Sequence, residues 1–391
     1  MSMSHQPATD QSAIDETATD ETANDGAATD EAATDEARAD QELIGARIDW
    51  SLAATTGKRL SRPGPLTTAY TLRATHAELA DAASRAEAPV REVTGLADGL
   101  RVPTTRILDR REWIDAAATS MSSMLGAGDA DGGQGISGKI GGLQAGGLLA
   151  FLSTAILGQY DPFTPDPETG DPGVLMVVAP NIISVERALK VVPSDFRLWV
   201  CLHEVTHRVQ FSANPWLRQY MLDNIAVLTA EADESTSEML GRITGALREG
   251  TIKGPDGDRP REKGVIGAMQ LLQSPEQYEA LTRMMMLGTL LEGHADHVMD
   301  AVGPAHVPTV ENIRAAFDRR RTGPRNPVQR IIRALIGMDA KLAQYIRGKA
   351  FVDEVVSTVG MESFNAIWSS PDTMPRPAEI DEPRAWIRRV L

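Results

Sequence analysis

The spacing of apolar residues along the chain predicts a mostly helical protein. After residue 67, apolar positions recur three and four residues apart through most of the sequence, and this is the spacing of one face of a helix. The expected helices cover about 68–97, 107–125, 137–157, 195–212, 216–248, 264–273, 276–301, 309–320, 326–346 and 348–358.

One short stretch has the pattern of a strand. Residues 173–180, GVLMVVAP, form a continuous apolar run rich in valine between a turn-forming segment and Pro180. Such a run fits a strand buried on both faces, and it also fits an edge strand beside an active site. The expected fold class is therefore mainly α (α+β), with a small β-sheet and a large helical remainder.

An uncharged stretch, residues 140–160, is long enough to cross a bilayer. It is rich in glycine and contains Gln144, Ser153 and Thr154, so its hydrophobicity is weak. We expect a core helix whose small residues allow close packing, and no membrane span.

Charge is concentrated at the start of the chain. Residues 1–40 supply −10 of the formal net charge of −15, in steps of five residues with almost no large apolar side chains. Such a segment cannot offset the entropy of ordering, so residues 1–42 are expected to form a disordered acidic tail. The tail could bind a protein partner or simply maintain solubility.

The remaining chain, residues 43–391, is expected to form one catalytic domain. A helical N-terminal part (43–157) and a catalytic part (158–391) are a further division that the pattern allows. An acidic tail on a nearly neutral body argues against nucleic-acid binding. The single cysteine, Cys201, fits a reducing compartment, and a cytoplasmic location is expected.

Residues 202–211 read LHEVTHRVQF. Four helical positions turn the chain by about 400°, so His203 and His207 point to the same side, with Glu204 beside them. In this pattern two neutral imidazoles hold a catalytic zinc ion, and the carboxylate takes a proton from a water molecule. A chance match on a core helix is the alternative. The motif predicts one zinc ion per chain, with Glu204 as the catalytic base.

A catalytic zinc site usually has a third protein ligand. The metzincin continuation fails because Gln210 and Ala213 stand where glycine and histidine are required. The segment LLEGHADHVMD, residues 290–300, offers Glu292 and Asp296 on one side of an otherwise apolar helix, an arrangement that resembles that of the gluzincins. We expect Glu292 to bind the metal and Asp296 to hydrogen-bond a ligand histidine, which would fix the orientation of its ring.

Alternatives remain for the third ligand and for the group that stabilises the transition state. An acidic stretch, residues 230–239, is the rival source of a ligand through Glu231, Glu234 and Glu238, although a solvated helix face also explains it. Zincins usually add a hydrogen-bond donor for the developing oxyanion. The candidates for this role are Tyr345, His297 and Tyr160.

Several separated motifs in this order give the chain a family resemblance. They are FRLWVCLHEVTHRVQF, GQYDPF (158–163), VVAPNI (177–182), EGHADHVMDAVG (292–303), GMDAKLAQYIRGKAFV (337–352) and GMESFNAIWSSPDTMPRPAEI (360–380). From about residue 44 onward the chain resembles an actinobacterial family of zincin-like, zinc-dependent metalloproteases. Members are often described as hydrolases, and some are associated with deazaflavin-coenzyme biosynthesis. The resemblance implies a mostly helical gluzincin-like fold with zinc on His203, His207 and Glu292, and it implies no substrate.

Two hypotheses about function follow. The first is a zinc-dependent hydrolase of a peptide or related amide bond, in which Glu204 activates water and passes the proton to the leaving amine. The second is a protein that keeps the zincin fold, and its zinc site, for scaffolding or partner binding without proteolysis. An intact Glu204 favours the first hypothesis, because a purely structural zinc site has no need of a general base.

Overall fold

The computed structural model describes residues 48–103, 105–125, 135–167, 169–230, 274–322 and 338–391, with the backbone alone for 318, 320–322 and 338–346. The elements are α2 (Trp50–Leu60), α3 (Ala69–Thr94), β1 (Thr105–Leu108), α4 (Arg110–Met124), α5 (Ile136–Leu152), β2 (Gly158–Asp161), β3 (Val174–Val178), α6 (Ala179–Leu189), α7 (Pro193–Ala213), α8 (Trp216–Thr229), α11 (Pro275–His306), α12 (Val310–Thr322), α14 (Met338–Phe364), η2 (Asn365–Trp368), η3 (Pro371–Thr373), α15 (Pro377–Asp381) and α16 (Pro383–Val390).

Several expected features lie outside the described residues. They are the acidic tail 1–42, the rival ligand group Glu231, Glu234 and Glu238, the second part of the helix expected at 216–248, the helix expected at 264–273, and the first part of the helix expected at 326–346. The residues from Leu43 onward belong to one unit.

The three strands form a mixed sheet in the order β1-β3-β2. β3 pairs in parallel with β1 and antiparallel with β2, so the predicted strand is confirmed, but as the central strand. The interpretation of β3 as an edge strand beside the site is therefore wrong, and β2 takes the edge position. β1 precedes residue 158 and β2 and β3 follow it, so both proposed parts of the domain contribute to one sheet.

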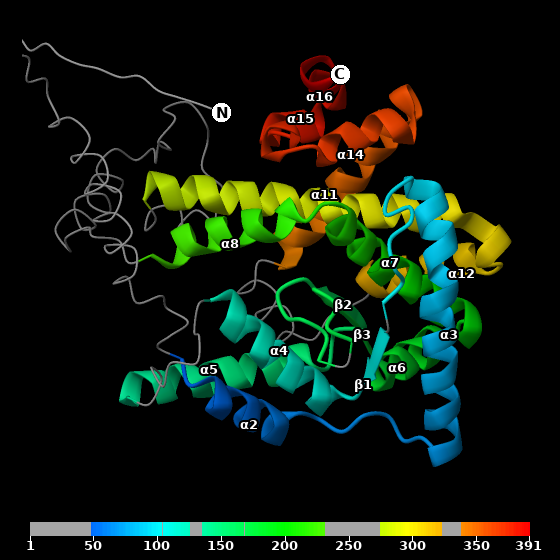
Figure 1. Cartoon of the computed structure of the whole chain (residues 1–391). Helices are drawn as coiled ribbons and strands as arrows, with labels where there is room; N and C mark the ends of the chain where they lie inside the picture. The colour runs from blue at the N-terminus through cyan, green and yellow to red at the C-terminus, as the bar shows by residue number, and fades with distance from the viewer. Residues whose placement is uncertain (1–47, 104, 126–134, 168, 231–273, 323–337) are drawn as a thin grey trace, which may run out of the picture. The chain divides into compact units, whose positions relative to one another are not determined.

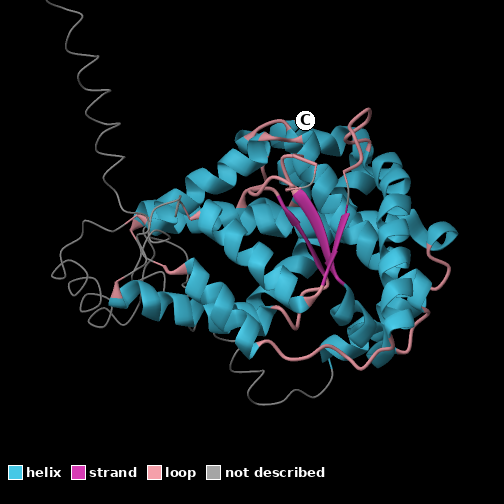
Figure 2. Ribbon diagram, turned by 60° about the horizontal axis from the view of Figure 1, so that its bottom comes forward, coloured by secondary structure: helices cyan, strands magenta, loops and turns pink. Residues whose placement is uncertain are grey.

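Helices cover both faces of the sheet, which explains why β3 is apolar at every position (Figures 1 and 2). Successive side chains of a strand point to opposite faces. Leu175 and Val177 face a core built with α3, α6 and α7, whereas Val174, Met176 and Val178 face a core built with α2, α4 and α5. A strand with one face in water would alternate apolar and polar residues. Both faces of β3 are buried, so the strand shows no such alternation. The mainly helical fold class is confirmed.

The helix expected at 107–125 begins later than the pattern suggested. Residues 105–108 form β1, and the helix α4 starts at Arg110. Asp109 separates the two elements, because its side chain accepts hydrogen bonds from the backbone of Arg111 and Glu112 while Glu112 bonds back to the Asp109 nitrogen. This capping box, rather than helical periodicity, decides the boundary.

Several helical stretches were not expected, among them the short 3-10 helices η2 and η3. α2 is a short helix of small and polar residues with a weak apolar pattern. α6 begins where Pro180 was read as the end of β3, because proline is tolerated in the first turn of a helix. The short helices after Thr373 pack on α14 through Trp386, which is fully buried.

Residues 140–152 of the uncharged segment belong to α5, which lies directly on α2, whereas residues 158–160 belong to β2 and not to the expected helix. A Cβ atom on Gly142 would stand 2.6 Å from the Asp49 carbonyl oxygen, and one on Gly146 would stand 2.7 Å from the Ala53 carbonyl oxygen. The close packing expected of small residues is thus confirmed. The opposite face carries exposed Ile140 and Leu143, so α5 is buried on one side only.

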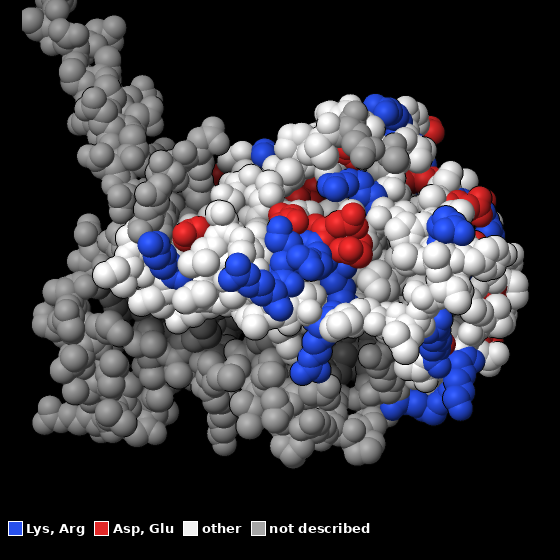
Figure 3. Space-filling view, turned by 90° about the horizontal axis from the view of Figure 1, so that it is seen from below, with Lys and Arg blue, Asp and Glu red and all other residues white. Residues whose placement is uncertain are grey.

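None of the described helices is both long enough and apolar enough to cross a membrane. On the face shown in Figure 3, lysine and arginine side chains lie beside aspartate and glutamate side chains among wide uncharged areas.

Candidate metal centre

Two helices that are distant in sequence bring three metal-binding side chains together. His203 and His207 project from α7, and Glu292 projects from α11. The Nε2 atoms of the histidines lie 3.1 Å apart, and the Glu292 Oε2 atom lies 3.3 Å from His203 Nε2 and 3.7 Å from His207 Nε2. Ligands at 2.0–2.1 Å from a tetrahedral zinc ion would be separated by about 3.3 Å, so these three groups fit zinc.

The Glu292 Oε2 atom is buried, and among the described residues its polar neighbours are the two ligand imidazoles, at distances longer than a good hydrogen bond. A buried carboxylate oxygen that is poorly paired is costly, and a cation between it and the two imidazoles would remove that cost. The ligand side chains as a whole remain 14–23% exposed. The cluster therefore keeps an open side, as catalytic zinc sites do.

Hydrogen bonds on the far side of each imidazole ring direct its Nε2 atom toward the cluster. The Leu291 carbonyl oxygen can only accept, so the Gln210 amide nitrogen must face it, at 3.0 Å. The Gln210 oxygen then accepts from His207 Nδ1 at 2.9 Å, which leaves the Nε2 lone pair of His207 for a metal. His203 Nδ1 lies 3.3 Å from the Met299 sulfur, which is a weak acceptor. This contact likewise leaves the Nε2 lone pair of His203 for a metal.

Gln210 also reaches a buried histidine of α11. Its amide nitrogen lies 2.9 Å from His294 Nδ1, which must therefore accept. His294 is fully buried beside Phe364 and Trp368, and burial lowers its pKa to about 3. His294 is thus a neutral, structural side chain that helps to hold Gln210 in place.

Electrostatics within the cluster are strong. Burial lowers the pKa of His203, but hydrogen bonding to Glu292 and the Glu292 charge outweigh this effect and raise that pKa to about 9. For Glu292, burial acts to raise the pKa, yet the two histidines hold it well below the usual range. The carboxylate is therefore anionic, the form in which it can bind a metal ion.

Glu204 lies beside the cluster and is buried, and burial raises the pKa of its carboxyl group. A group with a raised pKa is better matched to proton transfer near neutral pH. β2 lies directly against it, because a Cβ atom on Gly158 would stand 2.6 Å from the Glu204 Cγ atom and 3.0 Å from Oε1. Gly158 thus leaves the space that the Glu204 carboxylate occupies.

Gly158→Ala is expected to lower any hydrolytic rate by about 100-fold without loss of metal. The added methyl group would push the Glu204 carboxylate aside, and a displacement of about 1 Å from the reactive position can cost that much. Zinc content and hydrolytic rate should be measured on the same preparation. Gly147→Ala is the matched control, because a Cβ atom there meets nothing within 4 Å. Equal rates for the two variants would contradict this role of Gly158.

Asp296 lies one turn after Glu292 on α11, as the spacing predicted. Its carboxylate is 3.6 Å from the Arg314 guanidinium on α12, and its backbone oxygen accepts from Arg314 at 3.1 Å. The side chain that contacts the outer nitrogen of His203 is Met299. The predicted hydrogen bond between Asp296 and a ligand histidine is not among the contacts of the described residues.

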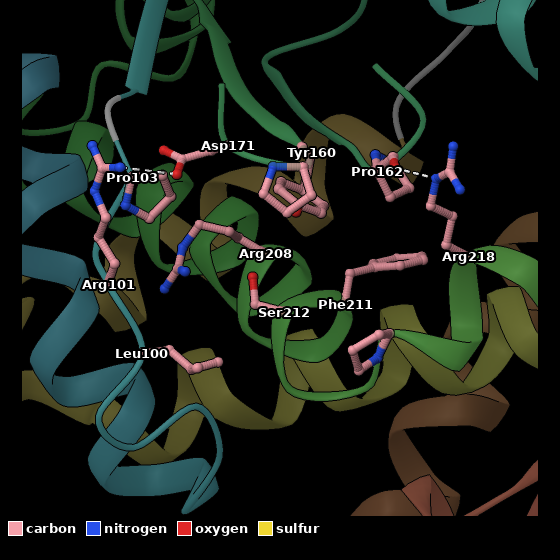
Figure 4. Close-up of a pocket in the computed structure, with 13 residues that line it drawn as sticks. Leu100, Arg101, Pro103, Tyr160, Pro162, Asp171, Arg208, Phe211, Ser212 and Arg218 are labelled. Atoms are coloured by element: carbon pink, nitrogen blue, oxygen red, sulfur yellow. Dashed lines mark hydrogen bonds and ion pairs between the residues drawn. The ribbon is translucent and has the colours of Figure 1, made fainter. Parts of the chain in front are cut away.

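The three candidate donors lie in different surroundings. Tyr160, on β2, packs against Phe211 with ring centroids 5.8 Å apart and lines a cavity (Figure 4). His297 Nδ1 is 2.7 Å from the Asp353 carboxylate of α14. The side chain of Tyr345 lies outside the described residues.

Two residues that shape the site escaped sequence analysis. Gln210 was noted only because it breaks the metzincin pattern, and Gly158 only within the motif GQYDPF. Gln210 lies three positions after His207 on the same helix, and this spacing is a usable signal for a hydrogen bond to the ring. Nothing in the sequence indicates that Gly158 faces Glu204, because that contact depends on how β2 packs on α7.

Comparisons with known proteins identify a family and a similar structure. A profile of zincin-like metallopeptidases matches residues 48–387. A crystal structure from Chloroflexus aurantiacus, described as a candidate hydrolase with a novel fold, is similar at 30% identity and a TM-score of 0.59, over 88% of this chain and 98% of that one. No curated protein matches. The family match supports a metallohydrolase as the kind of function. The resemblance carried by the motifs is thereby confirmed, and the chain belongs to the zincin-like metallopeptidase family.

Proposed function

We propose that the protein is a zinc-dependent hydrolase of peptide or related amide bonds. The observation that supports this most directly is the partly open cluster of His203, His207 and Glu292, with the carboxylate of Glu204 beside it. A zinc ion bound there would polarise the scissile carbonyl and acidify a water molecule.

The residues of this chain would divide the remaining work. Glu204 takes a proton from the attacking water and gives it to the leaving amine. Gln210 and Met299 keep the ligand imidazoles in the required tautomer. Gly158 leaves room for the Glu204 carboxylate and brings the backbone of β2 next to it.

The substrate backbone is proposed to extend along β2. This strand lies at the edge of the sheet, and pairing of an extended peptide with an edge strand is a common mode of recognition. β3, the other candidate, is occupied on both sides by β1 and β2.

Metal analysis of the purified full chain, combined with incubation with a pool of synthetic peptides, tests the proposal. We expect about one zinc ion per chain and the appearance of new amino groups, which a chelator abolishes and added zinc restores. Zinc in the protein without cleavage of any peptide or amide would favour the alternative, a zincin fold retained for partner binding.

A further inference from the structure

A cavity of about 260 Å³ lies beside the second half of α7 (Figure 4). Its wall carries three arginines, Arg101, Arg208 and Arg218, and one carboxylate, that of Asp171. Pockets for whole small ligands usually measure about 300–1,000 Å³. This cavity therefore has room for one small group, such as a side chain or a chain end.

Arg208 is a buried cation whose donors are only partly used. Its side chain is 1% exposed, and one terminal nitrogen pairs with Glu87. Glu87 also pairs with Arg91, so one carboxylate serves two guanidinium groups. The Nε and Nη1 atoms of Arg208 have no hydrogen-bond partner among the described residues. Unpaired buried donors are costly, and burial lowers the pKa of Arg208, so an anionic acceptor in the cavity would be stabilising.

The other charged residues reinforce the positive potential of the cavity. Arg101 pairs with Asp171 at 3.1 Å, and its own side chain is 64% exposed, which places it at the rim. Arg218 donates from Nε to the Pro162 carbonyl oxygen at 3.0 Å, and this bond holds its side chain at the wall. Figure 4 shows both contacts as dashed lines on either side of the cavity.

Two elements lead from the catalytic base to this cavity. On α7, Arg208 and Phe211 follow Glu204 by four and seven positions and share its face of the helix, about 6 and 10 Å further along. On β2, Tyr160 follows Gly158 by two positions and shares its face of the strand, about 7 Å away. An extended peptide that passes Glu204 along β2 would thus reach the cavity after about two residues.

The geometry points to a subsite for a substrate carboxylate in this cavity, about two residues from the bond that is cleaved. The carboxylate is either the C-terminal group of a peptide or an Asp or Glu side chain within it. Arg208, in the wall, supplies two buried donors without a partner among the described residues, and Arg101 supplies charge at the rim. This inference rests on the proposed peptide hydrolysis for the nature of the substrate.

Calorimetry on the zinc-loaded full chain tests the subsite, with the substitution Glu204→Gln so that peptides bind without turnover. Three probes are compared: N-acetyl-trialanine as the free acid, its C-terminal amide, and the amide of N-acetyl-Ala-Glu-Ala. A terminal-carboxylate subsite binds the free acid best, and a side-chain subsite binds the glutamate peptide best. Arg101→Gln and Arg208→Lys are each expected to weaken the preferred carboxylate peptide about tenfold.

Arg85→Gln is the matched control, because Arg85 is also mostly exposed and also pairs with one aspartate, Asp81, away from the cavity. It should leave the affinity unchanged. Arg101→Gln keeps the test valid if Arg208→Lys fails to fold. The subsite is overturned if no probe binds, or if neither the free acid nor the glutamate peptide binds better than the trialanine amide. It is also overturned if the carboxylate preference persists in Arg101→Gln, as it would if the metal alone bound the carboxylate.

Turnover in the unsubstituted protein separates this inference from the proposed function. Cleavage of peptides without any carboxylate preference would overturn the subsite and leave the hydrolase standing. Carboxylate binding that depends on Arg101 but is accompanied by no cleavage would overturn the proposed hydrolase and leave the subsite standing.

Discussion

Replacement of Glu204 by glutamine is expected to lower peptide hydrolysis by about 10²–10⁴-fold, the usual contribution of a general base, while the zinc content stays at about one ion per chain. The amide has nearly the shape of the carboxylate but cannot take a proton from water. The protein should stay folded, because burial already penalises the charged form of Glu204 and a neutral group at this position avoids that penalty.

The measurement is a rate of amide cleavage normalised to bound zinc, with the Gly147→Ala protein prepared in parallel as a folding control. A glutamine variant that keeps both its zinc and its rate would show that another group activates the water. Loss of zinc together with the rate would mean that Glu204 holds the metal rather than a proton.

Glu292→Gln is expected to weaken zinc binding by more than about 100-fold, since loss of an outer hydrogen-bond partner alone can cost 10–100-fold and a direct ligand contributes more. Glu292 also neutralises the cluster, because it is the anionic partner of His203 and His207. The loss should appear in competition with a chromophoric chelator. It should also appear as a smaller rise in melting temperature on adding zinc, because a ligand at 100 times its Kd stabilises a protein by about 2.7 kcal/mol.

Glu234→Gln decides between the two sources of the third ligand. Glu234 belongs to the acidic stretch that the sequence offered as a rival, and it lies outside the described residues. We expect this variant to keep its zinc. Loss of zinc in Glu234→Gln but not in Glu292→Gln would overturn the assignment of Glu292.

The metal cluster was accessible to sequence analysis because its parts are local patterns. The four-residue spacing of His203 and His207 fixes their common direction on any helix. Glu292, 85 positions beyond His207, was found as a carboxylate within an apolar helix, where a charge needs a partner. The structure brings the three side chains together.

What the sequence did not reveal depends on contacts between elements. The position of Gly158 against Glu204 follows from the packing of β2 on α7. The free donors of Arg208 become visible only when Glu87, 121 positions away, is seen to be shared with Arg91. The strand β1 was missed, and its second half was included in the helix expected at 107–125, because four residues are too few to show a period of two. The capping residues Asp109 and Glu112 nevertheless mark the true helix start.

The long helix α11 ties the stability of the cluster to that of two hydrophobic cores. Leu287, Leu290 and Leu291 belong to the core that α11 shares with α14, and Val298 and Met299 belong to the core that it shares with α3 and α7. Glu292 lies on this helix between the two sets. Neither core can open without moving the helix that carries the metal ligand, so the two should unfold in one cooperative transition, and an ion bound at their junction would protect both from local opening.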